Sequence, residues 1–196
     1  MNLEKTIYNL KLRGFGVQYF ETGAEAADYI CGEIKNSTVG IGGSKTVEAI
    51  GLYDKLAETN SVAWHWREPG METLKKAQVA DYYISSANAI SEDGQILNID
   101  GTGNRISSTV FGHKKVFIVV GTNKLCGDFN SALERARNVA AVKNCTRFNG
   151  NTPCKLDNKC HDCRSADKIC RALTVLWAPM NNMETEVVII GEDLGF

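Results

Sequence analysis

Apolar residues along the chain alternate between helical spacing and short, strand-length runs. Leu3, Ile7 and Leu10 recur at helical spacing before Gly14, and residues 15–20 then have the pattern of a strand. Further along, the same reading predicts helices at 24–35, 44–50 and 71–79 and strands at 38–41, 61–66 and 82–86. This alternation of strand and helix predicts a three-layer α/β fold with a largely parallel central sheet.

The pattern changes between residues 87 and 121, where short apolar runs are separated by Asp-Gly and glycine-rich turns. These runs predict strands at 89–90, 95–99, 106–111 and 116–120. Asp128 or Asn130 can cap a following helix that extends to about Val142, and two strands, at 172–177 and 186–190, end the pattern. We therefore expect an antiparallel insertion attached to the parallel sheet.

Composition favours one globular domain over residues 1–196, since 43% of the residues are hydrophobic and 23% are charged. A net charge of -1 argues against nucleic-acid binding. The longest apolar runs, such as 116–120, are far shorter than a membrane span. Residues 1–6 do not have the pattern of a signal peptide, so we expect a soluble, cytoplasmic protein, for which a homo-oligomer is compatible with the sequence.

Four of the seven cysteines fall within a polar segment at about 144–170, which we name the cysteine segment. The spacing is Cys154-x5-Cys160-x2-Cys163-x6-Cys170, in which the Cys-x-x-Cys pair can direct two sulfurs toward one ion. An iron–sulfur cluster of the [4Fe–4S] type is the expected occupant, with zinc as the alternative. Two disulfides, a redox thiol relay or idle thiols also fit the spacing, although a reducing cytoplasm disfavours structural disulfides.

A glycine-rich loop at 40–46 separates a predicted strand from a predicted helix. Its backbone N–H groups, the helix N-terminus and the Lys45 ammonium can surround an anion, and Glu48 lies one turn further on. The loop has neither the spacing of a phosphate-binding Walker loop nor that of a dinucleotide-binding loop. A tight turn whose small residues let the helix pack closely is the alternative interpretation.

A second loop at 98–105 combines two glycines with Asp100, Asn104 and Arg105. The guanidinium of Arg105 suits a carboxylate or a phosphate, unless Asp100 and Arg105 merely neutralise each other on the surface. Asn88 lies in an upstream loop that can approach the same place. The residues that we predict to bind a small anionic ligand are Gly42, Gly43, Ser44, Lys45, Thr46, Glu48, Asn88, Asp100, Gly101, Gly103, Asn104 and Arg105.

The order of these loops resembles the LUD-domain family of lactate-utilisation proteins, also known as DUF162. The resemblance covers nearly the whole chain. It is carried by the stretches at 42–52, 87–94, 98–105, 114–116, 121–124, 132–141 and 191–196. Among these the Asp-Gly-Thr-Gly-Asn-Arg run at 100–105 and the Gly-Glu-Asp-Leu-Gly ending at 191–195 are the most specific. The resemblance implies a fold related to the sugar-phosphate isomerase and CoA-transferase group, and it matches the small single-domain type of the family.

The resemblance also implies a part in the oxidation of lactate to pyruvate by a system of iron–sulfur proteins, whose other iron–sulfur subunits would be the partners. Three hypotheses about function follow. In the first, the chain is an iron–sulfur or accessory component that binds a small anion. In the second, it is a zinc-stapled binding or regulatory domain. In the third, it is an enzyme acting on a phosphorylated or CoA-like substrate. Neither the resemblance nor the sequence identifies a catalytic residue.

Overall fold

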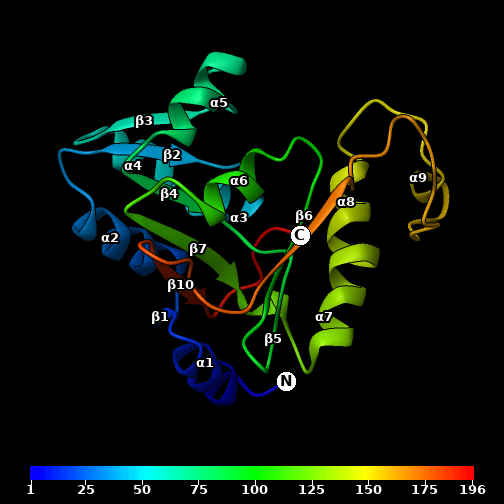
Figure 1. The fold of residues 1–196 in the computed structure, drawn as a ribbon, viewed down its shortest axis with the longest axis horizontal. Helices are drawn as coiled ribbons and strands as arrows, with labels where there is room; N and C mark the ends of the chain where they lie inside the picture. Colours follow the sequence, from blue (N-terminus) through cyan, green and yellow to red (C-terminus); the bar gives the residue numbers. More distant parts are fainter.

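The computed structural model describes residues 1–196, and its centre is a six-stranded sheet in which every strand pair is parallel (Figure 1). The spatial order is β1-β10-β7-β4-β2-β3. These strands are β1 (Gly16–Phe20), β2 (Thr38–Ile41), β3 (Ser61–Trp64), β4 (Tyr82–Ser85), β7 (Lys115–Gly121) and β10 (Glu184–Ile190).

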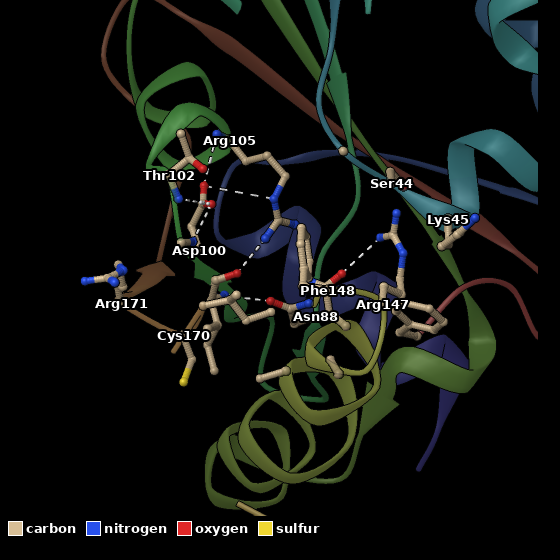
Figure 2. A pocket seen from close by; sticks show the side chains of 18 of the residues that line it. Ser44, Lys45, Asn88, Asp100, Thr102, Arg105, Arg147, Phe148, Cys170 and Arg171 are labelled. Atoms are coloured by element: carbon tan, nitrogen blue, oxygen red, sulfur yellow. Dashed lines mark hydrogen bonds and ion pairs between the residues drawn. The ribbon is translucent and has the colours of Figure 1, made fainter. Parts of the chain in front are cut away.

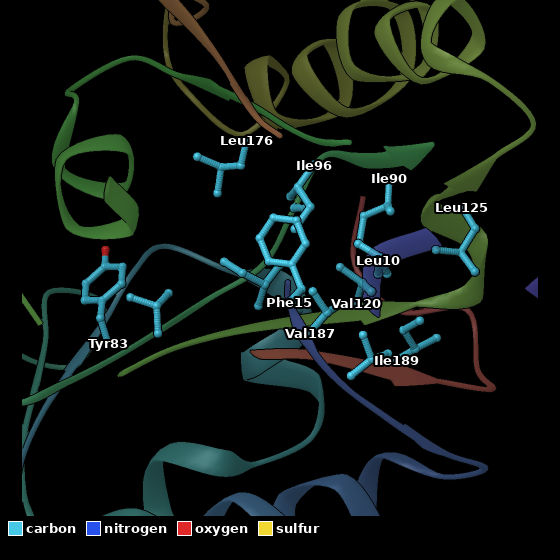
Figure 3. Packing of buried hydrophobic residues seen from close by; sticks show 14 of the residues in the cluster. Leu10, Phe15, Tyr83, Ile90, Ile96, Val120, Leu125, Leu176, Val187 and Ile189 are labelled. Atoms are coloured by element: carbon cyan, nitrogen blue, oxygen red, sulfur yellow. The ribbon is translucent and has the colours of Figure 1, made fainter. Parts of the chain in front are cut away.

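The central strands are buried on both faces, and successive side chains enter different cores. In β7, Val116 and Val120 belong to one hydrophobic cluster, whereas Phe117 and Val119 belong to the cluster on the opposite face. Figure 3 shows the first cluster, in which Leu10 packs near strand residues of β7 and β10. This burial explains why the central strands have continuous apolar runs.

Helices cover both faces of the sheet. The helices that precede the long C-terminal one are α1 (Leu3–Leu12), α2 (Gly23–Glu33), α3 (Lys45–Ala49), α4 (Leu52–Ala57), α5 (Met71–Gln78) and α6 (Asn104–Val110). Side chains of α2, α3 and α4 fill the core of one face. Side chains of α1, α5 and α6 join the core of the other face. None of the helices has the length and the apolar character needed to cross a bilayer.

A second, mixed sheet lies beside the parallel one, with the strand order β8-β5-β6-β9. Its strands are β5 (Ala89–Ser91), β6 (Ile96–Asp100), β8 (Leu125–Cys126) and β9 (Ala172–Leu176). Ile90 and Ile96 face the core that this sheet shares with the parallel sheet. Ala89 and Leu97 face the long C-terminal helix, which consists of α7 (Phe129–Arg135), a π-helical turn η2 (Ala136–Ala140) and α8 (Ala141–Cys145).

The predicted α/β fold, with a parallel sheet and an antiparallel insertion, is confirmed. The strand predicted at 106–111 is wrong, because residues 106–110 belong to the helix α6 and only Phe111, which follows it, is extended. The apolar spacing alone does not show where this helix begins. The Asp100 carboxylate accepts the backbone N–H groups of Arg105 and Ile106, which lie five and six residues further along the chain, and these hydrogen bonds start the helix. The helix α4 was not predicted.

Candidate functional site

A cavity of about 400 Å³ opens at the carboxyl ends of the parallel strands. Five strands send their following loops to its wall, with Gly43 after β2, His65 after β3, Ser86 after β4, Lys124 after β7 and Phe196 after β10. This edge is where α/β sheets usually bind ligands, since the loops of neighbouring parallel strands meet there. We name it the cationic cavity for the side chains described below (Figure 2).

The glycine-rich loop forms one wall by close packing. A Cβ atom on Gly42 would lie 2.7 Å from the Tyr83 hydroxyl and 2.9 Å from Ser85 Oγ. The side chain of Ser44 caps α3 by accepting the N–H of Val47 at 3.1 Å. Because α3 has only five residues and its cap is already a side chain, the positive charge of this wall comes from side-chain cations rather than from the helix end.

Asp100 organises the second loop. Its carboxylate accepts backbone N–H groups from Gly101 (2.7 Å), Thr102 (3.3 Å), Arg105 (3.0 Å) and Ile106 (3.1 Å). Burial raises the pKa of this carboxyl, but Arg105 and the N–H groups outweigh burial, so the pKa lies below its ordinary value. Asp100 is therefore an ionised structural anchor, whose oxygens are already engaged.

Arg105 is held in place beside this anchor. Its Nε lies 4.0 Å from Asp100 Oδ2, and its Nη2 donates to the carbonyl of Ile99. The backbone of Ile99 is fixed in turn, because its N–H donates to Asn88 Oδ1 at 2.6 Å. Asn88 thus fixes the end of strand β6, whose Ile99 carbonyl in turn holds the Arg105 guanidinium. The guanidinium lines the cavity with part of its donor set still available to a ligand.

Cationic side chains lie against aromatic rings where Trp66 lines the cavity. The Arg147 guanidinium lies 4.5 Å from the Trp66 ring centroid, and the Lys45 ammonium lies 5.3 Å from it. Arg147 also lies 6.0 Å from the ring centroid of Phe196. The rings hold two cations at the cavity wall without neutralising them.

Lys124 is a site residue that sequence reasoning missed. It ends the short helix η1 (Thr122–Lys124) after β7, and only 3% of it is exposed. Its Nζ lies 2.8 Å from both Thr46 Oγ1 and Ser86 Oγ. Burial, together with Arg135 and Arg105, lowers its pKa to about 7. The sequence signal that could have identified Lys124 is its position just after the apolar run of the central strand β7.

His65, which follows β3, also lines the cavity. Burial, and then Arg105, lower the pKa of its imidazole below the ordinary value. Its Nδ1 is buried without a hydrogen-bond partner. The lowered pKa favours the neutral imidazole of His65.

The charges around the cavity are unequal. Two acidic side chains line it, those of Asp100 and Asp167, and both accept backbone N–H groups. Six cationic side chains line it: Lys45, Arg105, Lys124, Arg147, Lys168 and Arg171. Because low-dielectric walls strengthen such a field, this excess makes the cavity attractive to anions.

The structure brings most of the predicted ligand-binding residues to this one cavity. Those that line it are Gly43, Ser44, Lys45, Asn88, Asp100, Gly101, Asn104 and Arg105. The others lie outside its lining: Gly42, Thr46, Glu48 and Gly103. Glu48 pairs with Lys45 at the surface, Thr46 contacts Lys124, and Gly103 adopts a positive φ of 87° where α6 begins.

The four predicted metal-binding cysteines line a second cavity of about 340 Å³, which we name the cysteine cavity. Cys154 belongs to α9 (Cys154–Asp157), and the other three lie in the loop that follows. Cys145, from α8, lines the same cavity. In the structure no three cysteine, histidine or carboxylate side chains are grouped closely enough to hold a metal ion together.

The two cavities share a wall. Lys168, Ile169, Cys170 and Arg171 line both of them, as do Ala141 of α8 and Ile99 of β6. Cys170 therefore faces both cavities, and the stretch 168–171 lies between a ligand in the cationic cavity and the other three cysteines.

The parallel sheet, the mixed sheet and the loops at the carboxyl edge define an α/β domain with a cavity in which cationic side chains outnumber acidic ones. The chain belongs to the LUD-domain family, whose model matches residues 3–190. A crystal structure of a DUF162 family protein from Deinococcus radiodurans has a similar fold, with a TM-score of 0.60 and 14% identity over 96% of each chain. No curated protein matches the sequence.

Proposed function

We propose that the cationic cavity binds a small carboxylate or phosphate anion, and that the protein serves lactate utilisation, the process with which its family is associated. The observation that carries this proposal is the charge balance of the wall. Five lysine and arginine side chains besides Lys124 line it, only Lys45 and Arg105 of these have a carboxylate partner, and the two acidic side chains of the wall are already engaged by the backbone. A bound anion would supply the missing counter-charge. L-lactate and pyruvate are the carboxylates that the family context favours.

Arg105 is the side chain on which we expect binding to depend most. Its position is fixed by Asp100 and by Ile99, and its side chain is 14% exposed, so a carboxylate that reaches it meets an oriented and partly dehydrated guanidinium. Titration calorimetry with L-lactate, pyruvate and inorganic phosphate tests this. We expect Arg105→Met to weaken binding at least tenfold.

Arg67→Met is the matched control for that titration, because Arg67 stacks on Tyr53 and pairs with Asp54 outside the cavity. Binding that is equal in both variants and the wild type would contradict the proposal. Preference for phosphate over both carboxylates would instead favour an enzyme or binding domain for phosphorylated ligands.

We also propose that the cysteine cavity holds an iron–sulfur cluster, with Cys154, Cys160, Cys163 and Cys170 as its ligands. The support is the donor set, since four thiols reach one cavity from a segment of sequence with metal-ligand spacing. Such a cluster would supply one-electron transfer. Arg137 lies at this cavity, with its guanidinium 3.9 Å from Cys160 Sγ, where it can offset thiolate charge.

Anaerobic purification followed by measurement of iron, acid-labile sulfide and zinc tests the cluster. We expect iron and sulfide near stoichiometry, lost in a Cys160→Ser, Cys163→Ser double variant and kept in Cys31→Ser, whose thiol lies on α2. Zinc without iron would favour the zinc-stapled domain, and the absence of both metals would refute the metal site.

A cluster in this position also leads us to propose a cytoplasmic location and the other iron–sulfur subunits of lactate oxidation as partners. Co-purification from an anaerobic extract with a tagged chain tests the partnership. Recovery of the tagged chain free of any iron–sulfur protein, under conditions that preserve its own cluster, would contradict it.

A further inference from the structure

Lys124 is the one buried side chain among the six cations of the cavity, and no carboxylate pairs with it. The charged groups that act on its ammonium most strongly are Arg135 and Arg105, which are both cations. Its only side-chain partners are two hydroxyls, those of Thr46 and Ser86, each at 2.8 Å. A lysine that merely attracted anions would not need this burial. Lys45 on the same wall shows the ordinary arrangement, since it is half-exposed and pairs with Glu48.

The number of partners matches the neutral form of the amine. An ammonium group has three N–H donors, and burial of an unpaired one is unfavourable. A neutral amine has two, which Thr46 and Ser86 accept, and it keeps one lone pair. Burial and the two neighbouring guanidinium groups also lower the pKa to about 7, so a large share of the amine is nucleophilic at neutral pH.

We propose that Lys124 forms an imine with the carbonyl group of a small 2-oxo acid whose carboxylate is held by Arg105. This inference rests on the proposed anion binding and adds to it the substrate class and a covalent step. The carboxylate is assigned to Arg105 because that guanidinium is oriented within the same cavity. The carbonyl is assigned to the amine because a lone pair on a buried lysine reacts with carbonyl carbon.

The reaction consumes one proton and releases water. The Nζ lone pair forms the C–N bond while the carbonyl electron pair moves to the oxygen, and one N–H proton passes to that oxygen through the Ser86 hydroxyl. A proton from solvent then converts the resulting hydroxyl group to water, and the C–O bond breaks to leave the iminium ion. No oxidant or reductant is needed.

Pyruvate with sodium cyanoborohydride tests the imine, because the reductant converts it to a stable secondary amine that peptide mass mapping can locate. We expect one reduced pyruvate per chain on Lys124, formed at least tenfold faster than modification of Lys45. We expect Lys124→Arg to lose this adduct. A mapped adduct that is absent from Lys124, or that is no faster there than at Lys45, would overturn the inference.

Titration of the same preparations with L-lactate separates this inference from the proposed function, since lactate has the carboxylate but no carbonyl. Lactate binding without an adduct on Lys124 would refute the imine and leave the anion site standing. Failure of both lactate binding and trapping would refute both. Ser86→Ala keeps the lysine, and we expect it to trap pyruvate more slowly, which a purely structural role for Lys124 would not predict.

Discussion

The carboxylate of Asp100 accepts the backbone N–H of Arg105 at 3.0 Å and lies 4.0 Å from the Nε atom of the same residue. One acidic side chain therefore determines where α6 begins and where the guanidinium lies in the cavity. The hypothesis that the two residues merely neutralise each other on the surface is wrong, because Asp100 is 7% exposed and both residues line the cavity.

Substitution of Asp100 should affect stability and binding together. We expect Asp100→Ala to lower the free energy of unfolding by about 2 kcal/mol through loss of a helix cap, and to weaken anion binding because Arg105 loses its anchor. Urea unfolding and calorimetry measure the two effects. Asp128→Ala is the control: Asp128 caps α7 through Ser131 outside the cavity, so it should lower stability and leave affinity unchanged. Unchanged affinity in Asp100→Ala would refute the positioning role.

Lys124 should give the protein a specific pH dependence of stability. Its pKa is about 7 in the folded protein and about 10.4 in an unfolded chain, so the unfolded chain binds more protons between these values. Stability from this group therefore rises with pH from about 7 to about 10. We expect the wild type to gain up to about 4 kcal/mol over this range relative to Lys124→Met. A difference between the two proteins that is constant with pH would contradict the neutral, buried amine.

Arg147 should contribute to binding through its position on the Trp66 ring. We expect Arg147→Ala to weaken anion binding by roughly tenfold, the scale of one charge-assisted contact, and to change the fluorescence of Trp66. Calorimetry and emission spectra measure these effects. Arg67→Ala removes a guanidinium that also stacks on a tryptophan, Trp64, at 5.9 Å, but outside the cavity. Equal losses of affinity in the two variants would indicate a nonspecific charge effect.

Two glycines should respond to alanine in opposite directions. A Cβ on Gly42 would meet the Tyr83 hydroxyl at 2.7 Å and Arg105 Cγ at 3.0 Å, so we expect Gly42→Ala to lower stability by about 1–3 kcal/mol and to weaken anion binding. Gly32 lies in α2 with no atom within 4 Å of an added Cβ. Gly32→Ala should raise stability by about 0.5–1 kcal/mol. Thermal unfolding measures the direction of the change in stability for both variants. A Gly42→Ala variant that is as stable as the wild type and binds the anion equally well would contradict this explanation.

Sequence pattern predicted the parallel sheet well because its strands are buried on both faces. The uninterrupted apolar run at 116–120 is typical of a central strand, and the neighbouring strands β4 and β10 also have apolar runs. The pattern failed at α6, where a side chain from the preceding strand starts the helix. Local apolar spacing carries no information about that capping contact.

The candidate site was predicted in part for a similar reason. Loops rich in glycine and charge, at 42–46 and 100–105, were recognisable in the sequence. Lys124 and Arg147 were not, since each reaches the cavity only through the order of strands and the path of the long helix. The metal site stays a prediction, because the spacing of the cysteines specifies thiol donors but not their occupant.

The most direct test of the central claim is a crystal structure of the protein soaked with pyruvate at a concentration that saturates the calorimetric titration. Our account predicts density in the cationic cavity, with the carboxylate within hydrogen-bonding distance of Arg105 and the carbonyl carbon joined to Nζ of Lys124. Pyruvate bound only at another place, with no density beside Arg105 and Lys124, would contradict the account.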